Sequence, residues 1–163
     1  MEKKTFEALY SINVNDKTEK KNNLTYLSWA WAWAEFVKVC PEAHYEIKTF
    51  DGKPYLHDEK LGYMVFTSIT VGDDTKEMWL PVMDGANKAM KDHPYKYQVR
   101  QKNWQSGNVE TVEKVCEAAS MFDINKTIMR CLTKNISMFG LGLYIYAGED
   151  LPEEIQNDKI NNQ

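Results

Sequence analysis

The chain has 163 residues, of which 43% are hydrophobic and 27% charged, and this composition is typical of one globular domain with a short tail. No apolar run reaches the roughly 18 residues of a membrane helix, and the N-terminal MEKKTFEALY lacks the apolar centre of a signal peptide. The net charge of -4 argues against a uniformly basic nucleic-acid binder, so the distribution of charge along the chain has to be considered.

The N-terminal quarter predicts two helices separated by a strand. Residues 1–23 are polar with a few apolar anchors, which favours a short helix, a strand and then a lysine-rich turn. Residues 25–40 predict a second helix, because Thr25 or Ser28 can cap it and Pro41 ends it. Its three tryptophans cover more than one face, so we expect this helix to be mostly buried.

The middle of the chain alternates polar and apolar residues and predicts antiparallel strands. Pro81 indicates that the fourth strand lies at a sheet edge, and Asp84 is expected to cap a short helix at 85–91. Turn sequences join the third to the fourth strand and the fifth to the sixth as hairpins. The six expected strands cover residues 44–50, 54–58, 61–71, 76–83, 95–102 and 109–116.

The last third predicts a long helix. Ser120 and Asp123 form an imperfect capping box at its start, and the helix runs to about Met138 and ends at Gly140. A final strand is expected at 143–146.

From Gly148 the sequence is acidic and rich in amides, which indicates a disordered tail, and we expect Pro152 onward to be dispensable for folding. We therefore expect a domain over 1–148 and a tail over 149–163. The predicted fold class is α+β, with antiparallel β-hairpins or a sheet packed against a long basic helix.

The chain has three cysteines, an odd number, and they are far apart in the sequence; they are Cys40, Cys116 and Cys131. This pattern indicates buried thiols in a reducing cytoplasm.

The long helix separates its residues into two stripes. Apolar side chains recur every four residues at Ile124, Ile128, Leu132 and Ile136. Cations recur with the same spacing, displaced by two positions or about 200° around the helix, at Lys126, Arg130 and Lys134. The helix has no acidic residue after Asp123, whereas a solvated helix usually mixes both signs. This pattern predicts a basic face that contacts phosphates.

A second basic cluster precedes this helix and consists of Lys88, Lys91, Lys96, Arg100 and Lys102. Aromatic residues interleaved with it are candidates for stacking on bases; they are Tyr95, Tyr97 and Trp104. The stretches 88–102 and 124–138 together hold eight cations and one acid, a charge of +7, so the rest of the chain carries -11. We therefore expect a basic surface on an acidic body.

Several alternatives remain open from the residues alone. A cation stripe is more often a solvated helix face than a DNA-binding face, and the basic hairpin can also pair with the acidic tail. The rival functions are a module that protects single strands without annealing them and a protein–protein adaptor. The triplet Glu46-Ile47-Lys48 occurs in metal-dependent nucleases, but Asp51 and Asp58 fall in turns. The histidines and cysteines lack metal-ligand spacing, and no Walker-type loop is present, so no catalytic residue, metal or cofactor is expected.

Three motifs that occur in order resemble one family. They are YLSWAWAWAEF, MWLPVMDGANKAM and MFDINKTIMRCLTKNISMFGLGLYIYAGEDL, and they resemble the Sak-type single-strand annealing proteins of phages and prophages over roughly 24–151. More distantly, the helix before Phe139-Gly140 is similar to the basic helix of the eukaryotic Rad-fifty-two annealing mediator. Lys134 of this chain stands at the position where that family has a DNA-binding arginine. Thr133 and Ser137 depart from the basic residues of that family.

The resemblance implies a β-hairpin, strand and helix core, assembly of copies into a ring or filament, and ATP-independent annealing without enzymatic activity. It also implies a function in DNA recombination and repair in the cytoplasm of a bacterial host. The partners expected from it are single-stranded DNA, further copies of the chain and a single-strand binding protein.

Overall fold

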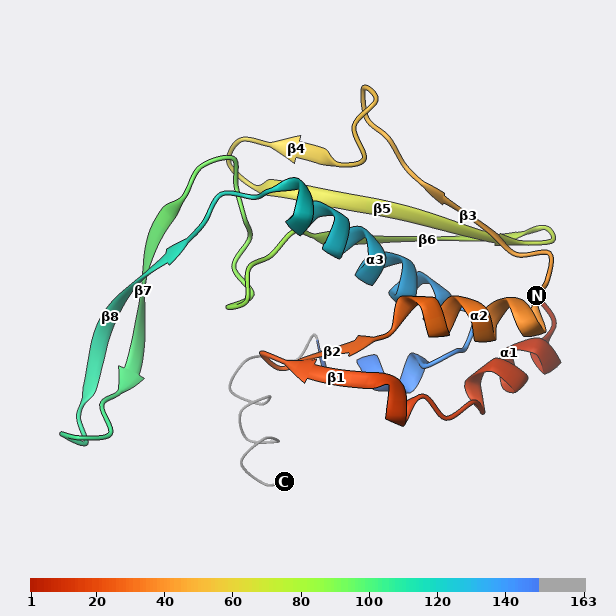
Figure 1. Cartoon of the computed structure of the whole chain (residues 1–163), viewed down its shortest axis with the longest axis horizontal. Helices are drawn as coiled ribbons and strands as arrows, with labels where there is room; N and C mark the ends of the chain where they lie inside the picture. Colours follow the sequence, from red (N-terminus) through yellow and green to blue (C-terminus); the bar gives the residue numbers. More distant parts are fainter. Residues whose placement is uncertain (150–163) are drawn as a thin grey trace.

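The computed structural model describes residues 1–149 and has a mixed α+β fold in which every paired strand is antiparallel (Figure 1). This confirms the predicted α+β class. Residues 150–163, and with them most of the predicted tail, lie outside the described residues. No helix within 1–149 combines the length and the apolar character needed to cross a membrane.

The main sheet is built on the long strand β5 (Gly62–Val71). β6 (Asp74–Pro81) pairs along nearly all of one edge of β5, so that β3 (His44–Ile47) and β4 (Leu56–Asp58) share the other edge. Among residues 1–149, β6 pairs with β5 alone, which confirms the edge position that Pro81 predicted.

Helix α3 (Met121–Ser137) packs across β5 and β6. The predicted capping box is present, since Asp123 N–H donates to Ser120 Oγ and Ser120 N–H donates to the Asp123 carboxylate at 2.9 Å. Within the interface, Asn135 Nδ2 donates to Thr67 Oγ1 at 2.9 Å, and both side chains are fully buried. The polar contact fixes α3 against the sheet at a point where apolar packing alone would allow sliding.

A second layer covers the side of α3 that faces away from the sheet (Figure 1). Its apolar core joins Leu9, Phe36 and Leu132 to β5 through Ile69. α3 is therefore a central helix with neighbours on two sides. The elements of this layer are α1 (Lys3–Tyr10), the 3-10 helix η1 (Asn15–Lys17), β1 (Thr18–Lys21), β2 (Leu24–Leu27), α2 (Trp29–Val39) and the 3-10 helix η2 (Leu143–Tyr146).

Strands β7 (Tyr95–Lys102) and β8 (Val109–Cys116) pair only with each other within the described chain, with the predicted bounds. Figure 1 shows this pair extending away from the rest of the molecule as an arm. Only its base enters a core, where Tyr95, Tyr97 and Cys116 pack with Val82 and Ile128.

Gly140 follows α3 in a conformation that an L residue rarely adopts, with φ of 124°. A Cβ atom at this position would lie 2.7 Å from the carbonyl oxygen of Phe6 in α1. The glycine therefore permits both the turn after α3 and the close approach of α1.

The prediction of helix for residues 25–27 is wrong. Residues Leu24–Leu27 form β2, and α2 begins only at Trp29. The reason is the preceding turn, in which Asn22 and Asn23 have positive φ values of 49° and 67° and so close a tight hairpin with β1. Ser28 occupies the N-cap position without a side-chain cap hydrogen bond.

Two further predictions are wrong. Residues 85–91 form a loop, because Asp84 Oδ1 accepts hydrogen bonds from the backbone N–H groups of Ala86 and Lys88 and so closes a turn where a helix was expected. Residues 143–146 form the 3-10 helix η2 instead of a strand. The positive φ of Gly142, 69°, turns the chain back onto the second layer at this point.

Candidate nucleic-acid interface

The cation stripe of α3 is exposed at only one end. Lys126 lies in solvent, whereas the Arg130 side chain is only 10% exposed and that of Lys134 only 18%. The expectation of a basic face open along the whole helix is therefore wrong for Arg130 and Lys134. The periodicity correctly separated the cations from the sheet-facing stripe, but it did not predict the second layer that covers them.

Glu149 is the counter-ion of the two covered cations. Its Oε2 lies 3.1 Å from Arg130 Nη2 and 3.5 Å from Lys134 Nζ, and its Oε1 accepts a hydrogen bond from the backbone N–H of Thr25 at 3.0 Å. The Glu149 side chain is only 7% exposed. One buried carboxylate thus compensates two largely buried cations, which leaves an excess positive charge beside the exposed Lys126.

Two tyrosines complete this charged cluster. The Arg130 guanidinium lies over the ring of Tyr26 at 5.3 Å, and Lys134 Nζ lies over the ring of Tyr146 at 5.5 Å. Such contacts hold a cation in place without neutralising its charge. Burial raises the pKa of Tyr146, so its phenol stays protonated.

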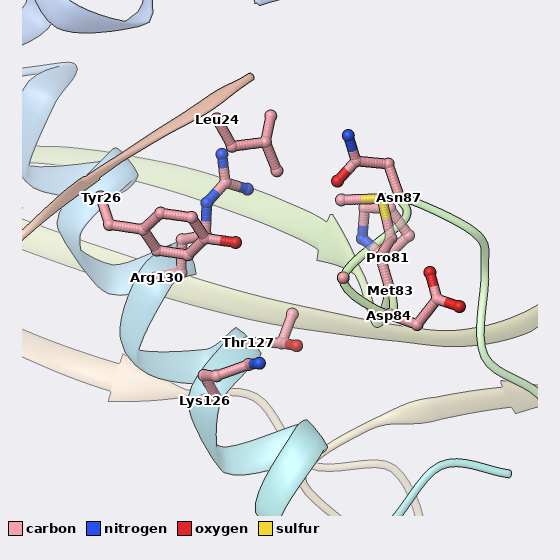
Figure 2. A pocket seen from close by; sticks show the side chains of 10 residues that line it. Leu24, Tyr26, Pro81, Met83, Asp84, Asn87, Lys126, Thr127 and Arg130 are labelled. Carbon is pink, nitrogen blue, oxygen red and sulfur yellow. The ribbon is translucent and has the colours of Figure 1, made fainter. Parts of the chain in front are cut away.

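Hollows open on the surface at the exposed end of the stripe. Figure 2 shows the smaller one, in which Lys126 and Arg130 of α3 lie near Tyr26, with Asp84 and Asn87 across from them; its volume is about 40 Å³. A larger cavity of about 310 Å³ is also bordered by Tyr26, Lys126 and Arg130, and reaches Trp29 and Phe122.

Arg130 also contributes an unused donor to this region. Its Nε is buried and has no hydrogen-bond partner among residues 1–149. A buried donor without a partner costs about 1–3 kcal/mol.

The second basic cluster is divided between the two faces of the arm. Lys96, Arg100 and Lys102 lie on one face of β7, and the register adds Thr111 and Glu113 of β8 to that face. Lys96 Nζ is 3.5 Å from Glu113, while no ion pair forms at Arg100 or Lys102 within the described chain. This face therefore keeps a net positive charge that is open to solvent.

The tyrosines lie on the opposite face and do not alternate with the cations on one surface. Tyr95 donates through its hydroxyl to the carbonyl of Ala89 at 2.6 Å, and burial raises its pKa to about 12. Lys88 Nζ lies 5.0 Å from the ring centre of Tyr97, and Lys91 Nζ lies 4.8 Å from that of Tyr95. These four side chains form the half-buried base of the arm, where the lysines already cover the rings.

Trp104 lies in the turn of the arm and is 86% exposed, with Lys102 Nζ 5.1 Å from its ring centre. Of the three aromatic residues proposed for stacking, this one has its ring most accessible. The arm extends away from α3, so the strand cations and the α3 cations do not form one continuous cluster within a single copy (Figure 1).

Five residues beside the α3 cations were absent from the sequence prediction; they are Tyr26, Trp29, Phe122, Tyr146 and Glu149. Trp29 was expected in a mostly buried helix but is 47% exposed. The available signal was the position of Phe122, a large apolar residue in the first turn of the helix and outside its apolar stripe. Glu149 was assigned to the tail, and no local pattern reveals a long-range counter-ion.

The nuclease-like triplet has a different environment from a metal site. Lys48 forms an ion pair with Glu77 of β6, and Glu46 lies on β3 opposite Ser68. No group of three His, Cys, Asp or Glu residues that could hold a metal ion occurs within 1–149.

The model of a protein family described as Sak Single Strand Annealing Protein matches residues 4–163. No curated protein and no solved structure matches the chain.

Proposed function

The chain belongs to the Sak single-strand annealing protein family, and on this basis we propose that it binds single-stranded DNA beside α3 and anneals complementary strands without ATP. The binding site in this proposal has two separate parts, Lys126 beside α3 and the arm face of Lys96, Arg100 and Lys102, which neighbouring copies of the chain would bring into line. In this proposal the protein has no catalytic residue.

The observation that carries the proposal is the uneven charge around α3. Lys126, Arg130 and Lys134 are spaced by one helical turn, and Glu149 is the only carboxylate paired with them within the described residues. Cations that remain in excess at a surface hollow attract polyanions, and the overall charge of -4 does not cancel this local field. Phosphates are the anions that a single strand provides at regular spacing.

The proposed mechanism requires no hydrolysis. Phosphates that contact Lys126 and the arm release condensed counterions, which favours binding at low salt. The strand is then held extended beside a surface that can receive a second strand. Base pairing, at roughly 1.4 kcal/mol per step, supplies the driving force for annealing.

We further propose that several copies act together in the cytoplasm, because one copy presents few accessible cations. Strand β6 leaves one edge unpaired within the described chain, and the arm exposes Val109 and Val115 on the same face as its cations. A two-stranded arm is marginally stable alone and gains from packing against a neighbour. A ring or filament with the Rad-fifty-two-like arrangement would align the cation sites, and a single-strand binding protein would deliver the strand.

The test is a binding and annealing assay with complementary labelled oligonucleotides, with no nucleotide cofactor present. Lys126→Ala should weaken single-strand binding and reduce the slope of log affinity against log salt by about 0.7, the value for one lost phosphate contact. The matched control is Lys38→Ala, which removes an exposed lysine of α2 that pairs with Glu35. Equal behaviour of the two variants would contradict the proposed site, and binding without annealing would favour the strand-protecting module.

A further inference from the structure

The larger cavity beside α3 has features that phosphate binding alone does not explain. Its walls come from β2, the start of α2, α3 and η2, and its volume is about 310 Å³. This volume is at the lower end of the roughly 300–1,000 Å³ of small-molecule pockets, and so suits one flat ring system better than an extended chain.

Large aromatic side chains stand at this cavity in contact with water. Trp29 is 47% exposed and Phe122 is 74% exposed, although both are large enough to be buried in a core. Tyr26 and Tyr146 also border the cavity, each with a cation over its ring. Exposed rings grouped around one hollow are typical of surfaces on which bases stack.

Arg130 supplies an independent observation. Its side chain is nine-tenths buried and borders the cavity, and its Nε–H group has no acceptor among the described residues. The Nε atom itself is covered, so a base in the cavity reaches this donor only when the side chains around it move apart; a ring nitrogen or carbonyl oxygen of the base then accepts from it.

The charge around the cavity favours the same occupant. Lys126 stands at the border of the cavity in solvent, where it can contact the phosphate attached to an inserted base. The arm of a second copy, with Lys102 beside Trp104, would instead bring a cation toward Lys126 and Arg130. Like charges at a desolvated contact oppose such docking.

We propose that this cavity takes one unstacked nucleobase of the bound strand, with the ring against Trp29 and Phe122 and an edge of the base toward Arg130. This inference rests on the proposed function and adds a base-recognition site to it. A base held in the cavity cannot pair, so each copy would withhold one base until the second strand or a change in the protein releases it.

The test compares oligothymidylate with a fully abasic strand of the same length. The variants are Trp29→Ala and Phe122→Ala, with Trp79→Ala as the control, since Trp79 is 55% exposed on β6 and does not border the cavity. The unmodified protein should prefer the base-containing strand, and each cavity variant should lose roughly 5- to 150-fold of that preference, the range for one stacked base. Affinity for the abasic strand and the salt slope should be unchanged, because phosphate contacts remain.

Four outcomes are distinguishable, and circular dichroism and mass measurements are made for each variant. Loss of the base preference in both cavity variants, with Trp79→Ala unaffected, supports the inference. Equal loss toward both strands, or no loss, overturns the inference but leaves the proposed function intact. A change in oligomeric state of the cavity variants overturns it in favour of an interface between copies. Absence of single-strand binding by the unmodified protein overturns both proposals.

Discussion

Glu149 and Arg130 form an ion pair of 3.1 Å in which both side chains are at most one-tenth exposed. The pair joins residues 19 positions apart, and the carboxylate of Glu149 accepts a hydrogen bond from Nη2 of the arginine. Glu149 therefore stabilises the covered part of the cation stripe, and under the proposed function it also competes with DNA for these cations.

Replacing Glu149 with Gln should separate these two effects. The free energy of unfolding should fall by about 3 kcal/mol, because two largely buried cations lose their counter-ion. Affinity for single strands at low salt should rise by about fivefold, since a unit charge at 4 Å contributes about 1 kcal/mol in water. Thermal unfolding with and without oligonucleotide measures both quantities. Glu35→Gln, which disrupts an ion pair on the surface of α2, is the control and should change neither.

The capping box of α3 provides a prediction of stability alone. Ser120→Ala removes the acceptor for the Asp123 N–H group and should lower the free energy of unfolding by about 1 kcal/mol. Ser120→Thr keeps the hydroxyl and should restore most of the loss. Urea unfolding of the three proteins measures the difference, and identical midpoints would show that the cap contributes nothing.

Gly140 should tolerate alanine worse than an ordinary turn glycine does. Gly140→Ala adds a Cβ atom 2.7 Å from the backbone of α1, at a φ of 124°. The matched control is Gly107→Ala in the turn of the arm, where φ is 72° and no atom lies within 4 Å of the added Cβ. We expect the Gly107 variant to lose about 1 kcal/mol through backbone strain and the Gly140 variant clearly more. Equal losses would indicate that α1 adjusts without cost.

Buried thiols predict how stability depends on pH. Burial raises the pKa of Cys131, Cys116 and Cys40 above the ordinary value of 9.0. Above pH 9 the unfolded chain has lost these protons while the native protein still holds them, so stability should fall as pH rises through this range. Burial raises the pKa of Tyr146 as well, which extends the fall to higher pH.

Thermal unfolding midpoints measured from neutral pH to about pH 10.5 test this dependence. Cys131→Ser keeps a hydroxyl near Thr67 but does not titrate, so its midpoint should fall less steeply. A midpoint that is constant or rises over this range would contradict the prediction.

The sequence predicted the elements whose cause is local. The arm strands have the expected bounds because alternation and a Ser106-Gly107-Asn108 turn define them, and the start of α3 follows from Ser120 and Asp123. Residues 25–27 were misassigned because pairing with β1 outweighed a helix-like composition. Of the candidate site, Lys126 is exposed as expected.

The remainder of the site depends on contacts between distant segments. Glu149 reaches Arg130 and Thr25 only because η2 turns the chain back over α3, and no spacing in the sequence indicates this. Tyr95 and Tyr97 alternate with cations in the sequence, but a strand places alternate residues on opposite faces. The sequence therefore predicted which residues belong to the basic cluster of the arm, but not that its cations and its tyrosines lie on opposite faces of the strand pair.

The hydroxyl of Tyr144 accepts a hydrogen bond from the backbone N–H of Val14, 130 positions earlier. This contact affects the order of events during synthesis. Segments around Val14 leave the ribosome early, but their partners follow only after those 130 residues, an interval of roughly 7–26 s at the usual elongation rate. The N-terminal elements of the second layer therefore cannot complete their packing at first, and apolar side chains such as Leu9 and Phe36 stay uncovered during this interval. A nascent chain of this protein is accordingly expected to depend on chaperones until the last turn around Gly142 has emerged.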